Sequence, residues 1–303
     1  MASATLPTMI STNFWCTGDV DEAAELYLRA FRQAEVVTHV DYPNSGLPDF
    51  LERFAGTTMQ VELELHGQRI GLTNAGTDVA PSPAISLLLN FDPAVFPDAC
   101  EYLDQVWAVL SEGATVRMDL GEYPHSPHYG WLQDRFGLSW QLMLTNPDGD
   151  PAPFVVPNVL FTEPVLWQAG VALEEWVAAI PGSQVLHRQP WAGPGAPEGA
   201  VAFADALLGG THFSVMDSGP GHSFEFTAGS SFVVHCADQA EIDRVWQALS
   251  AVPEAERCGW LVDRFGVSWQ VLPANLAELL QREGAYERLL GMRSIEIAEL
   301  ERL

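Results

Sequence analysis

Two histidines in one short loop form the densest histidine cluster in the sequence. His125 and His128 are separated by a Ser-Pro pair, and the carboxylates of Asp119 and Glu122 precede them. Imidazole nitrogens can chelate a divalent cation, but two histidines without a fixed third ligand make a poor site. We therefore favour an exposed loop rim at this place over a metal site.

Carboxylates could supply acid–base chemistry at other places. Glu62 and Glu64 alternate with apolar residues on one predicted strand, so both would face the same side of a sheet. A solvated sheet face explains the same pattern, and we prefer it. The Asp-Arg pairs at 134–135 and 263–264 stand in short turns, where such residues usually cap the turn. We assign these two pairs structural roles.

An internal repeat organises the whole chain. The sequence Gly-Trp-Leu-x-Asp-Arg-Phe-Gly-x-Ser-Trp-Gln occurs at residues 130–141 and again at 259–270. Upstream of it, residues 102–111 match 241–250, and both stretches carry apolar residues at helical spacing. A Pro-, Gly- and Asp-rich linker at 145–153 separates the two copies. The predicted organisation is therefore a first module at 1–145, a second module at 154–275 and a helical tail at 276–303.

Each module has the pattern of two βαβββ units. In the first module, Asp19 is the predicted N-cap of a helix with acidic residues in its first turn. The predicted elements of this module are a strand at 9–15, a helix at 19–31, strands at 36–40, 59–65, 69–73 and 84–90, a helix at 95–111, a short strand near Val116 and a hairpin through 134–137. The fold class is α+β, with helices packed on one face of the sheets.

Composition and charge exclude several kinds of partner. The 303 residues are 48% hydrophobic, and 14 Lys and Arg against 40 Asp and Glu give a formal charge of −26. Such an acidic surface repels nucleic acid and anionic membranes. Residues 1–7 show no secretory signal, no apolar run could span a bilayer, and the four cysteines form no Cys-x-x-Cys pair. We expect a cytoplasmic protein.

The repeated motif and the tail resemble a known family. Paired βαβββ units that end in the 130–141 motif are similar to the vicinal oxygen chelate superfamily, which includes glyoxalases, dioxygenases and drug-sequestering proteins. Within it, the motif and residues 286–300 resemble the PhnB-like group, labelled 3-demethylubiquinone 3-methyltransferase. The resemblance is weak over 166–200, where the sequence at 172–176 is only a degenerate counterpart of the expected helix. It implies two tandem glyoxalase-like modules that curve around a cleft. The methyltransferase label carries little weight, because the chain has no Gly-rich nucleotide motif.

Metal-dependent relatives carry His, Glu or Gln ligands on the first and last strands of these units. The resemblance places those positions at Thr12 or Asn13, near Ser86, and at Gln141 with its repeat counterpart Gln270. None is an imidazole or a carboxylate, and a neutral amide holds a divalent cation less tightly than a carboxylate does. We therefore expect neither a family-type metal centre nor another cofactor.

Alternation along the last strand of the first module decides which side chains face the cleft. Trp140 and the neighbouring leucines would lie under the helices, which leaves the alternate side chains for the cleft. The second module begins with a similar strand, in which Asn158 is the counterpart of Asn13. The predicted small-molecule site consists of Asn13, Ser86, Ser139, Gln141, Met143 and Gln270.

Three hypotheses for the function follow. The first is a metal-free cleft that binds a small, partly aromatic molecule, since metal ligands are missing and the chain has ten tryptophans. The second is a glyoxalase- or dioxygenase-type metal enzyme with atypical ligands, and the third is a structural or partner-binding module. We assign no catalytic residue. Because the linker already joins the modules, we predict that they pair as a pseudo-dimer within one chain, and we leave a further homo-oligomer open.

Overall fold

The computed structural model describes residues 10–47, 49, 51–76, 78–146, 148–149, 152–193 and 195–303. Residues 1–7, for which no secretory signal is predicted, and part of the predicted linker lie outside the described residues. The chain forms two compact units, each described here by itself. The N-terminal unit comprises Thr12–Leu160 and Thr227–Ser230, and the C-terminal unit comprises Met1–Ser11, Phe161–Phe226 and Ser231–Leu303. The units thus differ from the two halves of the sequence, because the N-terminal unit takes in most of the strand that follows the linker.

The N-terminal unit contains two groups of hydrogen-bonded strands, in the orders β1-β4-β3-β2 and β9-β5-β8-β7-β6. Within each βαβββ unit the first and last strands pair in parallel, β1 with β4 and β5 with β8. The other neighbours are antiparallel, including β5 with β9. The elements are β1 (Ile10–Trp15), α1 (Val20–Ala30), β2 (Ala34–Asp41), η1 (Glu52–Phe54), β3 (Thr58–Leu65), β4 (Gln68–Thr73), β5 (Ile85–Phe91), α2 (Ala99–Leu110), β6 (Thr115–Tyr123), β7 (Ser126–Gln133), β8 (Ser139–Leu144) and β9 (Val155–Phe161).

The C-terminal unit repeats this plan with strand orders β10-β11-β12 and β13-β15-β14. Strands β13 and β15 pair in parallel, as β5 and β8 do. Three short helices end the chain. The elements are α3 (Ala169–Ala179), β10 (Gln184–Pro190), β11 (Val201–Leu208), β12 (Thr211–Asp217), β13 (Ser230–Cys236), α4 (Gln239–Leu249), η2 (Pro253–Ala255), β14 (Trp260–Val262), β15 (Ser268–Pro273), α5 (Leu276–Leu279), α6 (Ala285–Leu290) and α7 (Ile297–Glu301).

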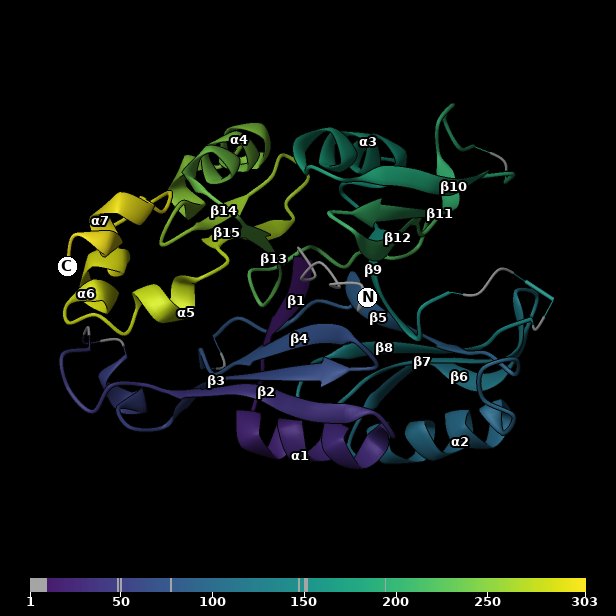
Figure 1. The fold of residues 1–303 in the computed structure, drawn as a ribbon. Helices are drawn as coiled ribbons and strands as arrows, with labels where there is room; N and C mark the ends of the chain where they lie inside the picture. The colour runs from purple at the N-terminus through teal and green to yellow at the C-terminus, as the bar shows by residue number, and fades with distance from the viewer. Residues whose placement is uncertain are drawn as a thin grey trace, which may run out of the picture. The chain divides into compact units, whose positions relative to one another are not determined.

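Helices cover one face of the strands in each unit. Figure 1 shows α1 and α2 side by side against the strands of the N-terminal unit. Helix α1 begins where the sequence predicts, because the Asp19 side chain accepts hydrogen bonds from the backbone N–H groups of Asp21 and Glu22. Its apolar face, which includes Leu26 and Tyr27, is completely buried. The core therefore lies between these helices and the strands, as the α+β prediction requires.

The predicted α+β fold with paired βαβββ units is confirmed, with two local corrections. Helix α2 begins at Ala99 and not at residue 95, since residues 93–98 form turns around Pro97. The helix expected in the weakly matching region 166–200 is present as α3, which has the same length as α1. In the last unit, η2 stands where the first module has β6, because residues 250–259 are too few for a long hairpin arm.

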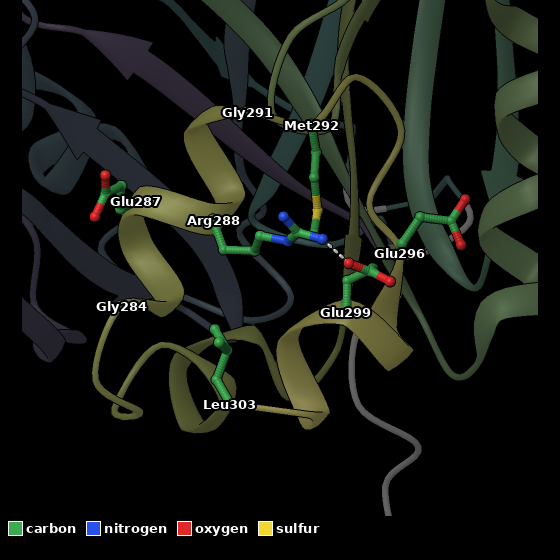
Figure 2. A pocket seen from close by; sticks show the side chains of 8 residues that line it. All are labelled: Gly284, Glu287, Arg288, Gly291, Met292, Glu296, Glu299 and Leu303. Atoms are coloured by element: carbon green, nitrogen blue, oxygen red, sulfur yellow. Dashed lines mark hydrogen bonds and ion pairs between the residues drawn. The ribbon is translucent and has the colours of Figure 1, made fainter.

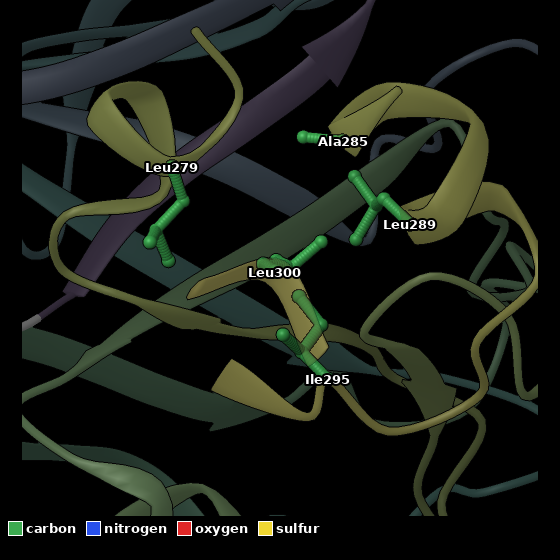
Figure 3. Close-up of a cluster of buried hydrophobic side chains, with 5 residues drawn as sticks. All are labelled: Leu279, Ala285, Leu289, Ile295 and Leu300. Carbon is green, nitrogen blue, oxygen red and sulfur yellow. The ribbon is translucent and has the colours of Figure 1, made fainter. Parts of the chain in front are cut away.

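The terminal helices pack around a small apolar cluster of their own. Figure 3 shows its five buried side chains, which are Leu279, Ala285, Leu289, Ile295 and Leu300. The cluster holds α5, α6 and α7 together, and Cys258 and Leu272 pack against it. Among the described residues, no helix is both long and apolar enough to cross a membrane.

Candidate functional site

Neighbouring residues on β8 have opposite surroundings. The indole of Trp140 is completely buried and packs on the rings of Tyr27 and Phe31, with ring centroids 5.2 and 5.4 Å apart. Tyr27 belongs to α1, so Trp140 faces the helices as the strand alternation predicts. Alternate side chains of a strand point to opposite faces, so Ser139, Gln141 and Met143 face away from the helices.

The amide of Gln141 is the centre of a buried chain of hydrogen bonds. Its Nε2 donates to Ser86 Oγ at 2.8 Å, and its Oε1 accepts from the Tyr129 hydroxyl at 2.7 Å. Asn158 Nδ2 lies 3.4 Å from the same Ser86 Oγ. All four side chains are buried, and Gln141 is 6% exposed. Both ends of the Gln141 amide are therefore satisfied by neighbouring side chains.

The register of the strands explains why these groups meet. In the parallel pairing of β5 with β8, Leu88 lies opposite Gln141. Ser86 precedes Leu88 by two residues and therefore lies on the same face of β5. Asn158 on β9 lies directly opposite Ser86. On the other side of β8, strand β7 places Trp131 opposite Gln141. The site therefore spans four adjacent strands of the N-terminal unit.

The other predicted residues of this strand have different roles. Ser139 is completely buried, and its Oγ accepts a hydrogen bond of 2.8 Å from Trp131 Nε1. Met143 is half-buried and lies opposite Tyr129 in the β7–β8 register. The structure therefore brings Ser86, Gln141 and Ser139 to one face, together with the rings of Tyr129 and Trp131.

Asn13 lies on the other strand group of the same unit. Its Oδ1 accepts a hydrogen bond of 2.9 Å from Thr73 Oγ1. A Cβ at Gly71, opposite Asn13 on β4, would lie 2.5 Å from this Oδ1 and 3.1 Å from Gln60 Nε2. Because Gly71 has no side chain, the amide groups of Asn13 and Gln60 can occupy the space above it. Thr12, the alternative position, is buried, and its hydroxyl has no hydrogen-bond partner among the described residues.

The remaining predicted residue, Gln270, belongs to the C-terminal unit. Gln270 Nε2 donates to Ser231 Oγ at 3.0 Å, which repeats the bond between Gln141 and Ser86. Strand alternation on β13 places His235 on the same face as Ser231. His235 Nε2 lies 2.9 Å from Ser11 Oγ. The sequence prediction missed this histidine, although its position four residues after Ser231 on a first strand could have indicated it.

Two further residues of the N-terminal site were also missed. Tyr129 directly precedes the repeated motif, so hairpin register alone could have placed it beside the last strand. Asn158 is related to Asn13 by the repeat, but the sequence prediction does not include it in the site. Its contact with Ser86 could not be predicted, because the β5–β9 pairing joins strands on the two sides of the linker.

The aspartates of the repeated motif are structural, as the sequence indicates. Asp134 accepts hydrogen bonds from Tyr27 Oη and Trp140 Nε1, both at 2.7 Å, and from the backbone N–H groups of Phe136 and Leu138. Burial raises the pKa of the Asp134 carboxyl above its ordinary value, and these hydrogen bonds oppose the shift. Both oxygens are used inside the core, which leaves none for catalysis.

His125 in the β6–β7 turn and His128 on β7 do not act as a pair. The His125 ring packs on the rings of Tyr123 and Tyr129, and burial lowers its pKa. His128 is instead directed to helix α2, where its Nε2 lies 2.7 Å from Asp104 Oδ1. The structure brings neither Asp119 nor Glu122 into this ion pair.

A cavity of about 600 Å³ lies between the terminal helices. Figure 2 shows Glu287, Arg288, Glu296 and Glu299 along its walls, with Arg288 paired to Glu299. The one guanidinium shown there is thus already matched by a carboxylate. The aromatic and amide groups of the Gln141 face are absent from these walls, so we place the candidate site on β5, β7, β8 and β9.

Comparisons with known proteins agree with this architecture. Glyoxalase I from Zea mays has 15% sequence identity and a TM-score of 0.55, covering 91% of this chain and 96% of its own. A putative dioxygenase from Bacillus subtilis has 11% identity and a TM-score of 0.52, covering 88% of this chain and 86% of its own. At these identities the likeness shows the fold alone, which is that of two tandem glyoxalase-like modules.

The family follows from the sequence match. The model of the 3-demethylubiquinone-9 3-methyltransferase family matches residues 8–143 and again 155–272, so the chain belongs to this family. A protein from Bacillus cereus described as a putative 3-demethylubiquinone-9 3-methyltransferase, PhnB protein, is 29% identical, with a TM-score of 0.38. The match covers 45% of this chain and 98% of that protein's own length. The predicted membership is thus confirmed. A search of curated proteins gave no match.

Proposed function

We propose that this chain binds a small, partly aromatic molecule at the Gln141 face of the N-terminal unit, without the metal centre of metal-dependent relatives. The observation that carries the proposal is the hydrogen-bond chain from Tyr129 through Gln141 and Ser86 to Asn158. Two of its members, Ser86 and Gln141, stand at strand positions at which the resemblance implies metal ligands.

The donor set of this chain does not fit a divalent transition metal. Its groups are a hydroxyl, a phenol and two amides, all neutral, and each end of the Gln141 amide already has a partner. A dication at this depth would need an anionic ligand to offset the loss of its hydration, and Ser86, Gln141 and Asn158 provide none. The Gln270 and Ser231 side chains, which are bonded to each other in the C-terminal unit, are likewise neutral.

Aromatic rings and one cation on the same side support an aromatic ligand. Tyr123 and Tyr129 pack edge to face at 5.5 Å, and Trp131 lies beside Tyr129 in the alternation of β7. The guanidinium of Arg117 lies 6.0 Å from the centre of the Trp131 ring and donates to Gln133 Oε1 at 2.8 Å. Few polar groups among rings are typical of a small-molecule site. We infer a ligand that carries a ring and a hydrogen-bond acceptor.

A thermal-shift screen of aromatic acids and amides tests the proposal. A binding compound should stabilise the protein by about 2.7 kcal/mol at a hundred times its dissociation constant. Gln141→Ala should weaken binding by about tenfold or more, which corresponds to about 1.4 kcal/mol. Gln105→Ala, an exposed residue of α2, is the matched control and should bind as the wild type does.

Two outcomes would contradict the proposal. One is a ligand whose affinity is the same for Gln141→Ala and the wild type. The other is a stoichiometric transition metal that is lost in the Gln141→Ala variant, which would restore the metal-dependent enzyme as the better hypothesis.

A further inference from the structure

Three different metal-binding side chains meet on the helix side of the N-terminal unit. Cys100 and Asp104 lie one turn apart on α2, and His128 lies on β7. The thiol, a carboxylate oxygen and an imidazole nitrogen are all within 4.8 Å of one another. Asp104 Oδ1 and His128 Nε2 are already in contact at 2.7 Å.

The fold explains why they converge. Tyr129 and Trp131 face away from the helices, so His128 and Gly130 face α2. At Gly130 the helix approaches closely, because a Cβ there would lie 2.5 Å from a ring carbon of Trp107. Asp104 is one turn before Trp107 and is thereby held against His128. This site lies on the face of β7 opposite to the Gln141 site.

The three groups match the preferences of a borderline-soft cation. Zn²⁺ in proteins takes thiolate, imidazole and carboxylate ligands at roughly 2.0–2.3 Å, usually four in a tetrahedron. The ligand atoms here need to move by only about an ångström or two to reach that spacing. A further carboxylate lies near the three groups, since Glu101 is next to Cys100 on α2. A water molecule would complete the coordination, because Cys100 and Asp104 are exposed to solvent.

We propose that Cys100, Asp104 and His128 form a binding site for one Zn²⁺, or for Co²⁺ in its place, at the surface of the first module. The imidazole would coordinate through the nitrogen that now contacts Asp104, and the Cys100 thiol would release its proton on binding. The site is independent of the proposed ligand at Gln141, from which it is separated by the sheet.

The second module shows what the same place looks like without the ligands. By the repeat, Gln239, Asp243 and Arg257 correspond to Cys100, Asp104 and His128. Gln239 Nε2 donates to Asp243 Oδ1 at 2.8 Å. An amide and a guanidinium thus replace the thiol and the imidazole, and a guanidinium cannot bind a cation. One ion per chain is therefore expected.

Cobalt titration of the full-length, untagged, chelator-treated protein under a non-thiol reductant tests the site. We expect one equivalent to bind with a thiolate-to-cobalt charge-transfer absorption, and Zn²⁺ to displace it. Cys100→Ser should abolish this absorption, and His128→Ala should weaken cobalt binding by about tenfold or more, as expected for loss of one of three ligands. Cys258→Ser and His125→Ala are matched controls and should titrate as the wild type does.

Circular dichroism of each variant shows whether it is folded, and both substituted ligand positions are at the surface or half-buried, so folding should persist. The proposal is overturned if the wild type shows no charge-transfer absorption with excess cobalt. It is equally overturned if Cys100→Ser retains the absorption while Cys258→Ser loses it. Gln141→Ala should leave the titration unchanged, which keeps this test separate from that of the proposed function.

Discussion

Trp140 and Gln141 are adjacent in the sequence, yet different forces hold their side chains. The Trp140 indole packs on Tyr27 and Phe31 and donates to Asp134, whereas the Gln141 amide is hydrogen-bonded to Ser86 and Tyr129. A large buried ring contributes mainly through packing, while a buried amide contributes mainly through satisfied polar atoms. The two residues should therefore respond differently to truncation.

Trp140→Ala should lower the free energy of unfolding by about 3–5 kcal/mol, because it leaves a cavity and removes a donor to Asp134. Gln141→Ala should cost less, about 1–3 kcal/mol, because the Tyr129 hydroxyl and Ser86 lose a partner. Urea denaturation of both variants measures the difference. Equal losses, with ligand binding intact in Gln141→Ala, would show that Gln141 serves the core and not the site.

The single most informative sequence signal at this scale was the repeated motif itself. Its period-2 alternation placed Trp140 against the helices and its Asp in a turn, and both hold in the structure. What the motif could not reveal is that Gln141 is nearly covered. That depends on Tyr129 and Trp131 from the neighbouring strand, whose register is set by the hairpin.

Among the elements, α3 was the hardest to predict, and the reason is chemical. In the first module Tyr27 of α1 donates its hydroxyl to Asp134, and in the second Trp176 of α3 donates its indole N–H to Asp263 at 2.9 Å. The two rings also pack on equivalent tryptophans, Tyr27 on Trp140 and Trp176 on Trp269. Both helices thus donate a hydrogen bond to the buried Asp, but from different residue types. A residue-by-residue sequence comparison therefore finds little similarity between them.

This equivalence gives a prediction for the two helices. Tyr27→Phe removes only the hydroxyl and should cost about 1–3 kcal/mol, because a buried acceptor on Asp134 loses a donor. Trp176→Phe should cost more, since it loses ring volume as well as the N–H bond to Asp263. Calorimetry of the two single variants compares them. If Tyr27→Phe has no measurable effect, the hydroxyl bond does not stabilise the helix.

Strand β9 is the other element whose role the sequence could not supply. The linker before it reads as a boundary, yet β9 pairs with β5, and Phe154 packs on Phe91 and Tyr102 at 5.0 and 5.8 Å. Local sequence patterns predict individual strands and helices well, but they do not show which distant strand will pair with the edge of a sheet. The module boundaries at 145, 154 and 275 therefore mark the sequence repeat and stay a prediction. The pairing of the two modules within the chain also stays a prediction.

At the scale of the whole chain, metal content separates the two proposed sites. Protein purified without chelator should carry no transition metal at the family positions, since these offer no charged ligand, and at most about one equivalent at Cys100, Asp104 and His128. Elemental analysis of the wild type, Gln141→Ala and Gln270→Ala should give the same content. A metal that falls in either glutamine variant would place a centre at the family positions and would contradict this expectation.

The tandem arrangement has a consequence for how such a chain can change. In an assembly of two identical subunits every substitution is made twice, so a residue that helps one copy must be tolerated by the other. Here each copy is encoded separately, and the differences between Tyr27 and Trp176, or between His128 and Arg257, show the copies diverging one at a time. One module can then acquire a new surface while its twin keeps the original form, which a single-module relative cannot do.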